Sequence, residues 1–232
     1  MPLPAVNLRF TERWLARQAP QPDRIRDEYL EAVLEPDPFR ARAIARDAAA
    51  SGIAVGTLYT EVFAPVLIEV GSRWESGAIS VAHEHLAAEV TASLVSELAG
   101  RLRLAPAAGR LAIVACSPGE RHCVGGQMLT GLLEGEAWEV LYLGATLPVE
   151  DLVALADSEV PDVVALSTTM RDHLPDAQAT VEALQSLAEP PLVAVGGQAY
   201  ESEEAAHRIG ADLWAPTALD APALIRERVP PA

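Results

Sequence analysis

The sequence is poor in cysteine and has no long apolar run. Only two of its 232 residues are cysteines, Cys116 and Cys123, so we predict neither a disulfide framework nor a zinc site and expect both thiols to be reduced. No apolar stretch reaches the roughly 18 residues of a membrane span, and residues 1–24 lack the charged and then apolar layout of a signal peptide. These absences predict a cytoplasmic protein that makes no membrane contact.

Basic residues are also scarce. Lys and Arg number 17 against 33 acidic residues, which gives a net charge of −16 and argues against direct nucleic-acid binding, since phosphate recognition needs a basic surface. One basic stretch lies at the amino terminus. Its arginines are Arg9, Arg13, Arg17, Arg24 and Arg26. We interpret residues 1–22 as a flexible, solvated arm, too short for a helix-turn-helix domain.

Residues 23–103 are predicted to form a four-helix bundle. Asp23 is expected to cap the first helix, and Asp37 followed by a proline marks the start of the second. Apolar residues then recur in steps of three and four from Val55 to Trp74, which predicts a long helix with a kink at Pro65. The fourth helix is expected to begin at Ser80, antiparallel to the third.

After a linker at 104–109, residues 110–232 alternate between strand and helix patterns, typical of an α/β domain. Strands are predicted at 110–116, 138–143, 162–167, 191–195 and 211–214, and helices near 124–134, 148–158, 173–188, 201–209 and 218–228. We expect five parallel strands in the flavodoxin-like, Rossmann-type order 2-1-3-4-5. The strand order then reverses between the first and third strands, where such sheets bind ligands.

Three polar or glycine-rich segments follow these apolar strands. His122 lies in the loop after the first strand, Ser167 to Thr169 follow the third after a gap of 41 residues from Gly125, and Gly196-Gly197 end the fourth after another 26. Because the strands are parallel, the three loops should meet at one edge of the sheet. Taken singly, His122 is as consistent with an ordinary loop residue, and the glycine pair with an ordinary turn. His173 and His207 are interpreted as surface or helix-capping residues.

Together the segments resemble the cobalamin-binding domain of methionine synthases, corrinoid mutases and corrinoid methyl carriers. The pattern of that family is Asp-x-His-x-x-Gly, then Ser-x-Leu, then Gly-Gly at such spacings. This sequence has Glu120 where most members have Asp, and Thr169 where many have Leu. The resemblance implies that His122 is the lower axial ligand of cobalt and that Glu120 fixes its tautomer. It also implies a slot for the nucleotide tail of the cofactor, lined by Gly125, Ser167, Thr169, Gly196 and Gly197.

A second motif joins the two long helices of the predicted bundle: Trp74, nine intervening residues, then Glu84 and His85. From the residues alone, Trp74 could be a packing residue, and Glu84 could complement the helix dipole. The motif resembles the signature of CarH/LitR-type photoreceptors, where it covers the upper face of adenosylcobalamin. Those proteins also use Glu-x-His-x-x-Gly, which stands here at Glu120, His122 and Gly125.

The resemblance covers about residues 23–220 and has two departures. The transcription-factor members begin with a MerR-type DNA-binding domain, which residues 1–22 do not contain, so we expect a stand-alone sensor. In well-known members the residue after the Trp is a histidine that can bind cobalt after illumination, whereas here it is Glu75. His83 or His85 could take that role, or water could.

The function expected from this resemblance is that of a light sensor rather than an enzyme, and no catalytic residue is assigned. Light would remove the upper ligand of adenosylcobalamin, the bundle would rearrange, and a partner protein or self-association into a homo-oligomer would read the change. Two alternatives remain open. One is a photocobilin-type sensor that also binds biliverdin, and the other is a corrinoid methyl carrier of a methyltransferase system.

Overall fold

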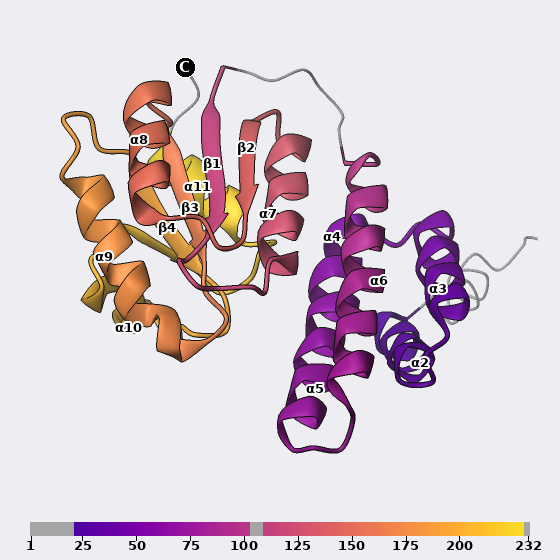
Figure 1. Ribbon diagram of the computed structural model, residues 1–232. Helices are drawn as coiled ribbons and strands as arrows, with labels where there is room; N and C mark the ends of the chain where they lie inside the picture. Colours follow the sequence, from indigo (N-terminus) through magenta and orange to yellow (C-terminus); the bar gives the residue numbers. More distant parts are fainter. Residues whose placement is uncertain (1–20, 103–108, 230–232) are drawn as a thin grey trace, which may run out of the picture.

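The computed structural model describes residues 21–102 and 109–229, which form a helical bundle and a five-stranded α/β unit (Figure 1). Most of the predicted arm and of the predicted linker lies outside these residues. The bundle consists of α2 (Pro22–Leu34), α3 (Pro38–Ala50), a long helical rod and α6 (Val81–Ala99); the rod runs without a break through α4 (Val55–Thr57), η1 (Leu58–Phe63) and α5 (Ala64–Glu75). The helical region therefore agrees with the prediction.

The starts of the helices follow the sequence signals in part. Asp37 caps α3 by accepting a hydrogen bond from Arg40 N at 2.9 Å. The prediction that Asp23 caps α2 is wrong. The helix begins at Pro22, one residue before Asp23, with Gln21 as the N-cap residue, because proline suits the first helical position. Ser80 is the N-cap residue of α6, but its side chain contacts His83 Nδ1 at 2.8 Å and makes no capping bond.

The long rod contains a π-helical segment just before Pro65, where we had predicted a simple kink. Pro65 has no backbone N–H, and its ring would collide with the carbonyl of residue 61 in a regular α-helix. The rod relieves this conflict by widening: Ala64 N donates to Tyr59 O, five residues back. One extra residue per turn thus accommodates Pro65 while the apolar stripe on both sides stays in the core.

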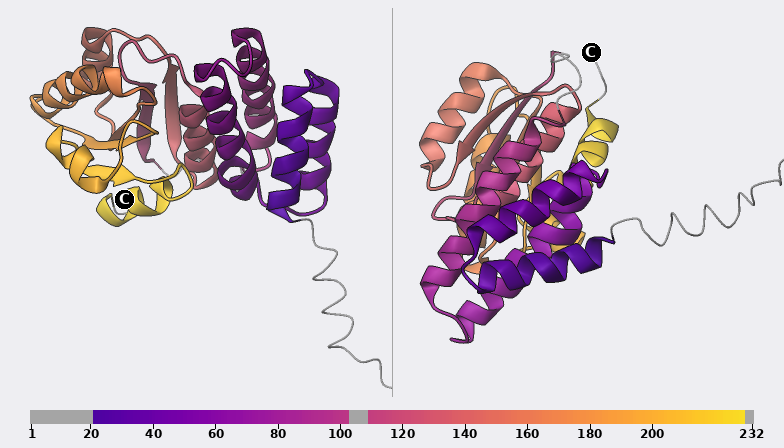
Figure 2. Two further views of the ribbon diagram at one scale, coloured as in Figure 1. Left: turned by 90° about the horizontal axis from the view of Figure 1, so that it is seen from below. Right: turned by 90° about the vertical axis from the view of Figure 1, so that its right-hand side faces the viewer.

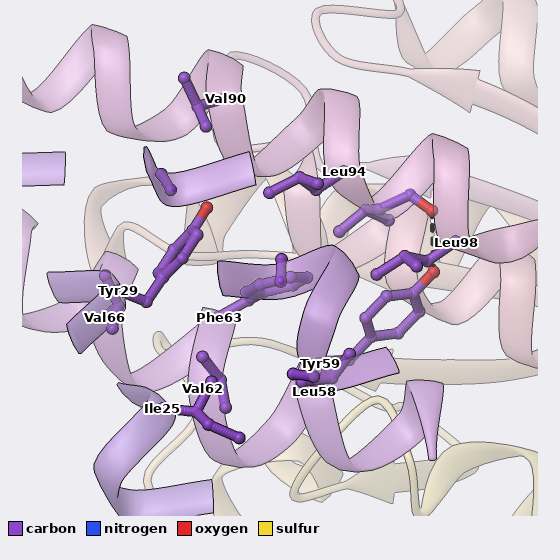
Figure 3. Close-up of a cluster of buried hydrophobic side chains, with 14 of the residues drawn as sticks. Ile25, Tyr29, Leu58, Tyr59, Val62, Phe63, Val66, Val90, Leu94 and Leu98 are labelled. Carbon is purple, nitrogen blue, oxygen red and sulfur yellow. Dashed lines mark hydrogen bonds between the residues drawn. The ribbon is translucent and has the colours of Figure 1, made fainter. Parts of the chain in front are cut away.

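Large side chains fill the core of the bundle (Figure 3). Tyr29 and Phe63 pack with ring centroids 5.1 Å apart. Both buried tyrosine hydroxyls have partners, because Tyr29 Oη lies 2.9 Å from Thr91 Oγ1 and Tyr59 donates to Val95 O at 2.8 Å. These bonds offset the cost of taking the hydroxyls out of water and attach α2 and the rod to α6.

The sheet has five parallel strands in the order β2-β1-β3-β4-β5, which confirms the predicted order. Their bounds are β1 Leu111–Cys116, β2 Glu139–Gly144, β3 Val163–Ser167, β4 Leu192–Gly196 and β5 Leu213–Ala215. The helices are α7 Val124–Gly135, α8 Val149–Glu159, α9 Leu174–Gln185, α10 Glu203–Arg208 and α11 Ala221–Arg228, with a 3-10 turn, η2, at Arg171–His173. Apolar residues of α7 and α11 cover one face of the sheet and those of α8, α9 and α10 cover the other.

The bundle and the sheet unit meet along α6 and α7, which lie side by side in two views (Figures 1 and 2). Met128 and Leu132 of α7 belong to the core of the bundle. The two backbones approach closely at Gly131, where an added Cβ would lie 3.2 Å from Ala99 Cβ. In Figure 1 the end of the bundle formed by α5 and α6 extends beyond the edge of the sheet at which β1 ends.

None of the helices in the described ranges is both long enough and apolar enough to cross a membrane.

Gly131→Val should lower the free energy of unfolding by about 1–3 kcal/mol, because its branched side chain would force α6 and α7 apart. Gly71→Val is the matched control: Gly71 also lies inside a helix, but an added Cβ there has no neighbour within 4 Å. Urea titrations should give a much smaller change for the control. Equal losses in both variants would contradict a close contact between α6 and α7.

Candidate functional site

Three loops meet at the carboxyl edge of the sheet, as the sequence predicts. In the strand ladder Cys116 pairs with Ser167, and Ser167 pairs with Gly196, so the last residues of β1, β3 and β4 lie side by side. The loop that follows β1 carries Glu120 and His122 and leads into α7.

The centre of the site is the carboxylate of Glu120, which is 0% exposed. One oxygen, Oε1, accepts from Arg121 N and His122 N of its own loop at 2.8 and 2.9 Å and contacts His122 Nδ1 at 2.5 Å. The other oxygen, Oε2, accepts from Thr169 N and Met170 N at 2.8 Å each. Glu120 therefore joins the loop after β1 to the loop after β3.

This hydrogen bonding keeps Glu120 ionised. Burial on its own would raise the pKa of the carboxyl, but the bonds from the His122 side chain and from three backbone N–H groups outweigh it and lower the pKa to about 2. The same contact with Glu120 raises the pKa of His122, against the effect of burial.

The Glu120 contact also determines which nitrogen of His122 is available. Because Nδ1 donates its hydrogen to the carboxylate, Nε2 is the ring nitrogen that can bind a metal, and the His122 side chain is 45% exposed. A neutral imidazole held by a buried carboxylate is a common arrangement for a metal-binding histidine. Cobalt accepts such a nitrogen ligand.

Small residues line the same edge. Gly197 has φ +108°, and a Cβ there would lie 2.2 Å from Thr168 O, so only glycine fits without a shift of the backbone. A Cβ on Gly196 would lie 3.2 Å from Ala215 O, and one on Gly125 would lie 3.6 Å from Ser167 Oγ. At Gly196 and Gly197 the missing Cβ therefore lets neighbouring backbone segments approach closely.

Thr168, which the sequence analysis did not select, connects the three loops. Its hydroxyl is buried, lies 2.7 Å from Ser117 Oγ and is 3.1 Å from Tyr200 Oη. The signal in the sequence was that Thr168 is a polar residue directly after a buried strand. The sequence analysis selected its neighbours, Ser167 and Thr169, instead. Thr169 has a different contact in this structure, since its backbone N–H donates to Glu120.

The bundle brings one of the second set of predicted residues, Glu84, within range of this edge. Glu84, on α6, has a side chain that is only 18% exposed, whereas Trp74, one residue before the end of α5, is 44% exposed. The charge of Glu84 also contributes to the raised pKa of His122, after the larger contribution of Glu120, so it lies within electrostatic range of the imidazole. His85 is 73% exposed and contacts Glu84 Oε2 at 2.6 Å.

The site fits a metal that brings most of its ligands with it, because His122 offers a single nitrogen, Nε2. In the described part of the chain, no group of three or more His, Cys, Asp or Glu side chains could hold a metal ion by itself. Of the two cysteines, both free, Cys116 is buried, and burial raises the pKa of its thiol to about 12.

Comparison with protein families identifies both parts of the chain. Residues 110–223 match the B12 binding domain, and residues 25–99 match a second model described in the same words. Both regions are cobalamin-binding domains. The chain therefore belongs to the cobalamin-binding proteins.

Similar proteins include transcriptional repressors and corrinoid proteins. The transcriptional repressors CarH and CarA of Myxococcus xanthus are 39% identical over 63% of this chain and 33% identical over 84% of it. The chain spans 49% of the length of CarH and 66% of that of CarA. Dimethylamine corrinoid protein 3 of Methanosarcina mazei is 27% identical over 66% of this chain, which spans 93% of its length.

A solved structure shares the fold. The monomethylamine corrinoid protein of Methanosarcina barkeri has a TM-score of 0.79 at 19% identity, over 90% of this chain and 100% of that one. The arrangement of a helical bundle followed by a parallel five-stranded sheet is therefore the corrinoid protein fold.

Glu120→Gln should lower the free energy of unfolding by about 2–4 kcal/mol at neutral pH. A glutamine would point its NH₂ group at backbone N–H donors that now bind a carboxylate, and each buried group left unsatisfied costs roughly 1–3 kcal/mol. Denaturant titrations of both proteins at pH 7 measure the difference.

The pH dependence provides the control. Since folding lowers the pKa of Glu120 from its ordinary value of 4.5 to about 2, the stabilisation is fully present above pH 4.5 and is lost as the pH falls towards 2. The difference between wild type and Glu120→Gln should therefore shrink in that window. A difference that stays constant down to acidic pH would contradict the assigned role of the charge.

Proposed function

We propose that the chain is a cobalamin-dependent light sensor in which His122 holds the cofactor from below and the bundle covers the bound adenosyl group. The observation that carries this proposal is the position of Trp74 and Glu84. Trp74 is near the last residue of α5 and Glu84 is in the first turn of α6, the helix ends that extend beyond the sheet edge in Figure 1, and the charge of Glu84 acts on His122. A ligand held by His122 would thus meet both units.

The lower side of the site is built to bind and orient. Glu120 keeps the proton of His122 on Nδ1 and so presents Nε2, while its bonds to Thr169 and Met170 hold the neighbouring loop in place. Beside it, Gly125 and Ser167 would accept the nucleotide tail of cobalamin, with Gly196 and Gly197. Adenosylcobalamin, when bound, would supply light absorption and a light-sensitive cobalt–carbon bond.

The upper side is provided by Trp74, Glu84 and His85. Trp74 is 44% exposed, so an adenosyl group could pack on the uncovered part of its side chain. Glu84 and His85 would offer polar contacts, and His83 or His85 could approach the cobalt after illumination, in place of the histidine that Glu75 replaces.

The signal would travel through α6. One end of this helix carries Glu84 at the site, and its other end packs tightly on α7 through Ala99 and Gly131. A ligand shifts the balance between two arrangements of a protein only through contacts that one arrangement has and the other lacks. The contact between Trp74 and the adenosyl group would exist only while that group is bound. We propose that the resulting change is read by a partner protein or by self-association. Direct DNA binding is not expected at a net charge of −16.

A corrinoid methyl carrier is the competing function. It is favoured by the similarity to dimethylamine corrinoid protein 3 and by the fold shared with the monomethylamine corrinoid protein. In that case Trp74 would cover no ligand, and the upper face would stay open to a methyltransferase. A photocobilin-type sensor with biliverdin as a second chromophore is the further alternative, and an absorption spectrum with and without biliverdin distinguishes it.

His122→Ala should weaken cobalamin binding and change the absorption spectrum of the bound cofactor, because no other imidazole lies in that loop and Cys123 is displaced by one residue. Titration followed by absorption measures both effects. His207→Ala, on α10, is the matched histidine control and should leave both affinity and spectrum unchanged. If His122→Ala keeps the wild-type affinity and spectrum, His122 is not the ligand.

Trp74→Ala should lower the affinity for adenosylcobalamin more than for methylcobalamin, because only the larger group reaches the indole. Removing such a contact costs on the order of 1–3 kcal/mol, or roughly a tenfold to hundredfold change in Kd. Ile68→Ala, on the same helix and similarly exposed at 48%, is the control and should leave both affinities unchanged.

The light response gives the second readout. Wild type loaded with adenosylcobalamin should change its hydrodynamic size or its affinity for a partner on illumination, with a sample kept dark as control. Equal losses for both cobalamins in Trp74→Ala, together with no response to light, would favour the methyl carrier.

A further inference from the structure

Tyr142 of β2 contacts the loop that carries His122 but is not among the residues of the proposed cobalamin site. Its hydroxyl donates a hydrogen bond to Cys123 O at 3.1 Å. Cys123 directly follows His122 and is the N-cap residue of α7. A side chain from the edge strand of the sheet therefore holds the point at which the His122 loop ends and α7 begins.

The ring of Tyr142 fits closely against the first turn of α7 because Gly126 has no side chain. An added Cβ on Gly126 would lie 3.2 Å from Tyr142 Cε2 and 3.8 Å from the hydroxyl oxygen. The same Cβ would lie 3.7 Å from Val114 Cγ1, on the neighbouring strand β1. The ring thus fills the space between β2 and α7, on the sheet face that α7 covers.

The regular pairing of β2 ends at Tyr142. Val114 of β1 pairs with Tyr142, but Ala115 pairs with Gly144, so the ladder skips Leu143. Gly144 has φ +71°, a conformation that favours glycine. An extra residue of this kind, as in a β-bulge, bends its strand and redirects nearby side chains, and such features are frequent beside functional sites. The irregularity of β2 is therefore placed next to the residue that reaches Cys123.

The backbone of His122 is consequently held on both sides. On its amino side, Glu120 accepts from His122 N at 2.9 Å. On its carboxyl side, Tyr142 donates to Cys123 O. Cys123 O also accepts from Gln127 N at 3.0 Å, but that bond lies within the first turn of α7 and does not connect the turn to the sheet. Burial raises the pKa of the Tyr142 hydroxyl, so the group keeps the proton that it donates.

We propose that Tyr142 is a positioning residue for His122: its hydrogen bond to Cys123 O fixes the backbone after His122 and so keeps Nε2 in the place from which it binds cobalt. This role rests on the proposed function of His122 as the lower ligand. Glu120 fixes the tautomer and one side of the loop, but the imidazole can still shift if the backbone that follows it moves. The bond from Tyr142 also connects the ligand loop to α7, the helix on which α6 of the bundle packs.

Tyr142→Phe tests the proposal in the full chain, because it removes only the hydroxyl and leaves the ring between β2 and α7. Cobalamin should bind about threefold to tenfold more weakly, which is less than the roughly tenfold to hundredfold loss expected when a group bonded directly to a metal ligand is removed. In electron paramagnetic resonance of the cobalt(II) form, the superhyperfine splitting from the His122 nitrogen should become smaller or broader. The reason is that a less firmly held imidazole has a longer or more varied bond to cobalt.

Tyr59→Phe is the matched control. It removes the same kind of bond, from a tyrosine hydroxyl to a backbone carbonyl, since Tyr59 donates to Val95 O at 2.8 Å within the bundle. Both variants should be less stable to urea than wild type, because each leaves a carbonyl without one of its partners. Tyr59→Phe should nevertheless keep the wild-type affinity for cobalamin and the wild-type splitting.

Gly126→Ala perturbs the same contact from α7, because its methyl group would push the Tyr142 ring away and weaken the bond to Cys123. It should change the splitting in the same direction, and it should add little when combined with Tyr142→Phe. Wild-type affinity and splitting in Tyr142→Phe would overturn the proposal while His122 remained the ligand. Equal changes in Tyr142→Phe and Tyr59→Phe would overturn it as well, since a general loss of stability would then be the cause. A wild-type splitting that does not respond to ¹⁵N-histidine would overturn both the proposal and the assignment of His122.

Discussion

The site depends on one buried carboxylate. Glu120 accepts hydrogen bonds from its own loop and from the loop after β3, and it also holds the imidazole of His122. Without it, two backbone segments would have buried N–H groups without partners, and His122 would have no fixed tautomer. Loop geometry and ligand orientation are therefore determined by the same interaction. The strongly lowered pKa of Glu120 reflects how completely its charge is satisfied.

The second constraint is the close contact between α6 and α7. Gly131 allows Ala99 to approach, and Met128 and Leu132 extend the core of the bundle onto the sheet unit. This packing fixes the height of α6 relative to the sheet, so that its first turn, with Glu84, lies near His122. Any movement of the bundle in response to a ligand must either preserve the contact between α6 and α7 or break it. This contact is therefore a suitable place for a switch between two arrangements of the bundle.

Much of this structure could be predicted from the sequence, because the determining patterns are local. Apolar strands followed by polar loops predicted the order of the sheet, and the spacing from Gly125 to Ser167 and Gly196 predicted which loops meet.

What could not be predicted depends on contacts between distant segments. Two of the five hydrogen bonds of Glu120 come from the backbone N–H groups of residues 169 and 170, which no side-chain pattern indicates. The burial of Thr168 between Ser117 and Tyr200 likewise requires the assembled sheet. The π-helical segment before Pro65 shows a further limit: the proline signals a disturbance in the helix but does not specify its form.

The account is tested most directly by electron paramagnetic resonance of the full chain loaded with the cobalt(II) form of cobalamin. If His122 presents Nε2 to cobalt from below, the superhyperfine splitting from an axial nitrogen should change when the protein is labelled with ¹⁵N-histidine, since the ligand then comes from the protein. A splitting that is the same in labelled and unlabelled protein would mean that the cofactor keeps its own base or has no axial nitrogen. That result would contradict the assignment of His122 and Glu120 as the site.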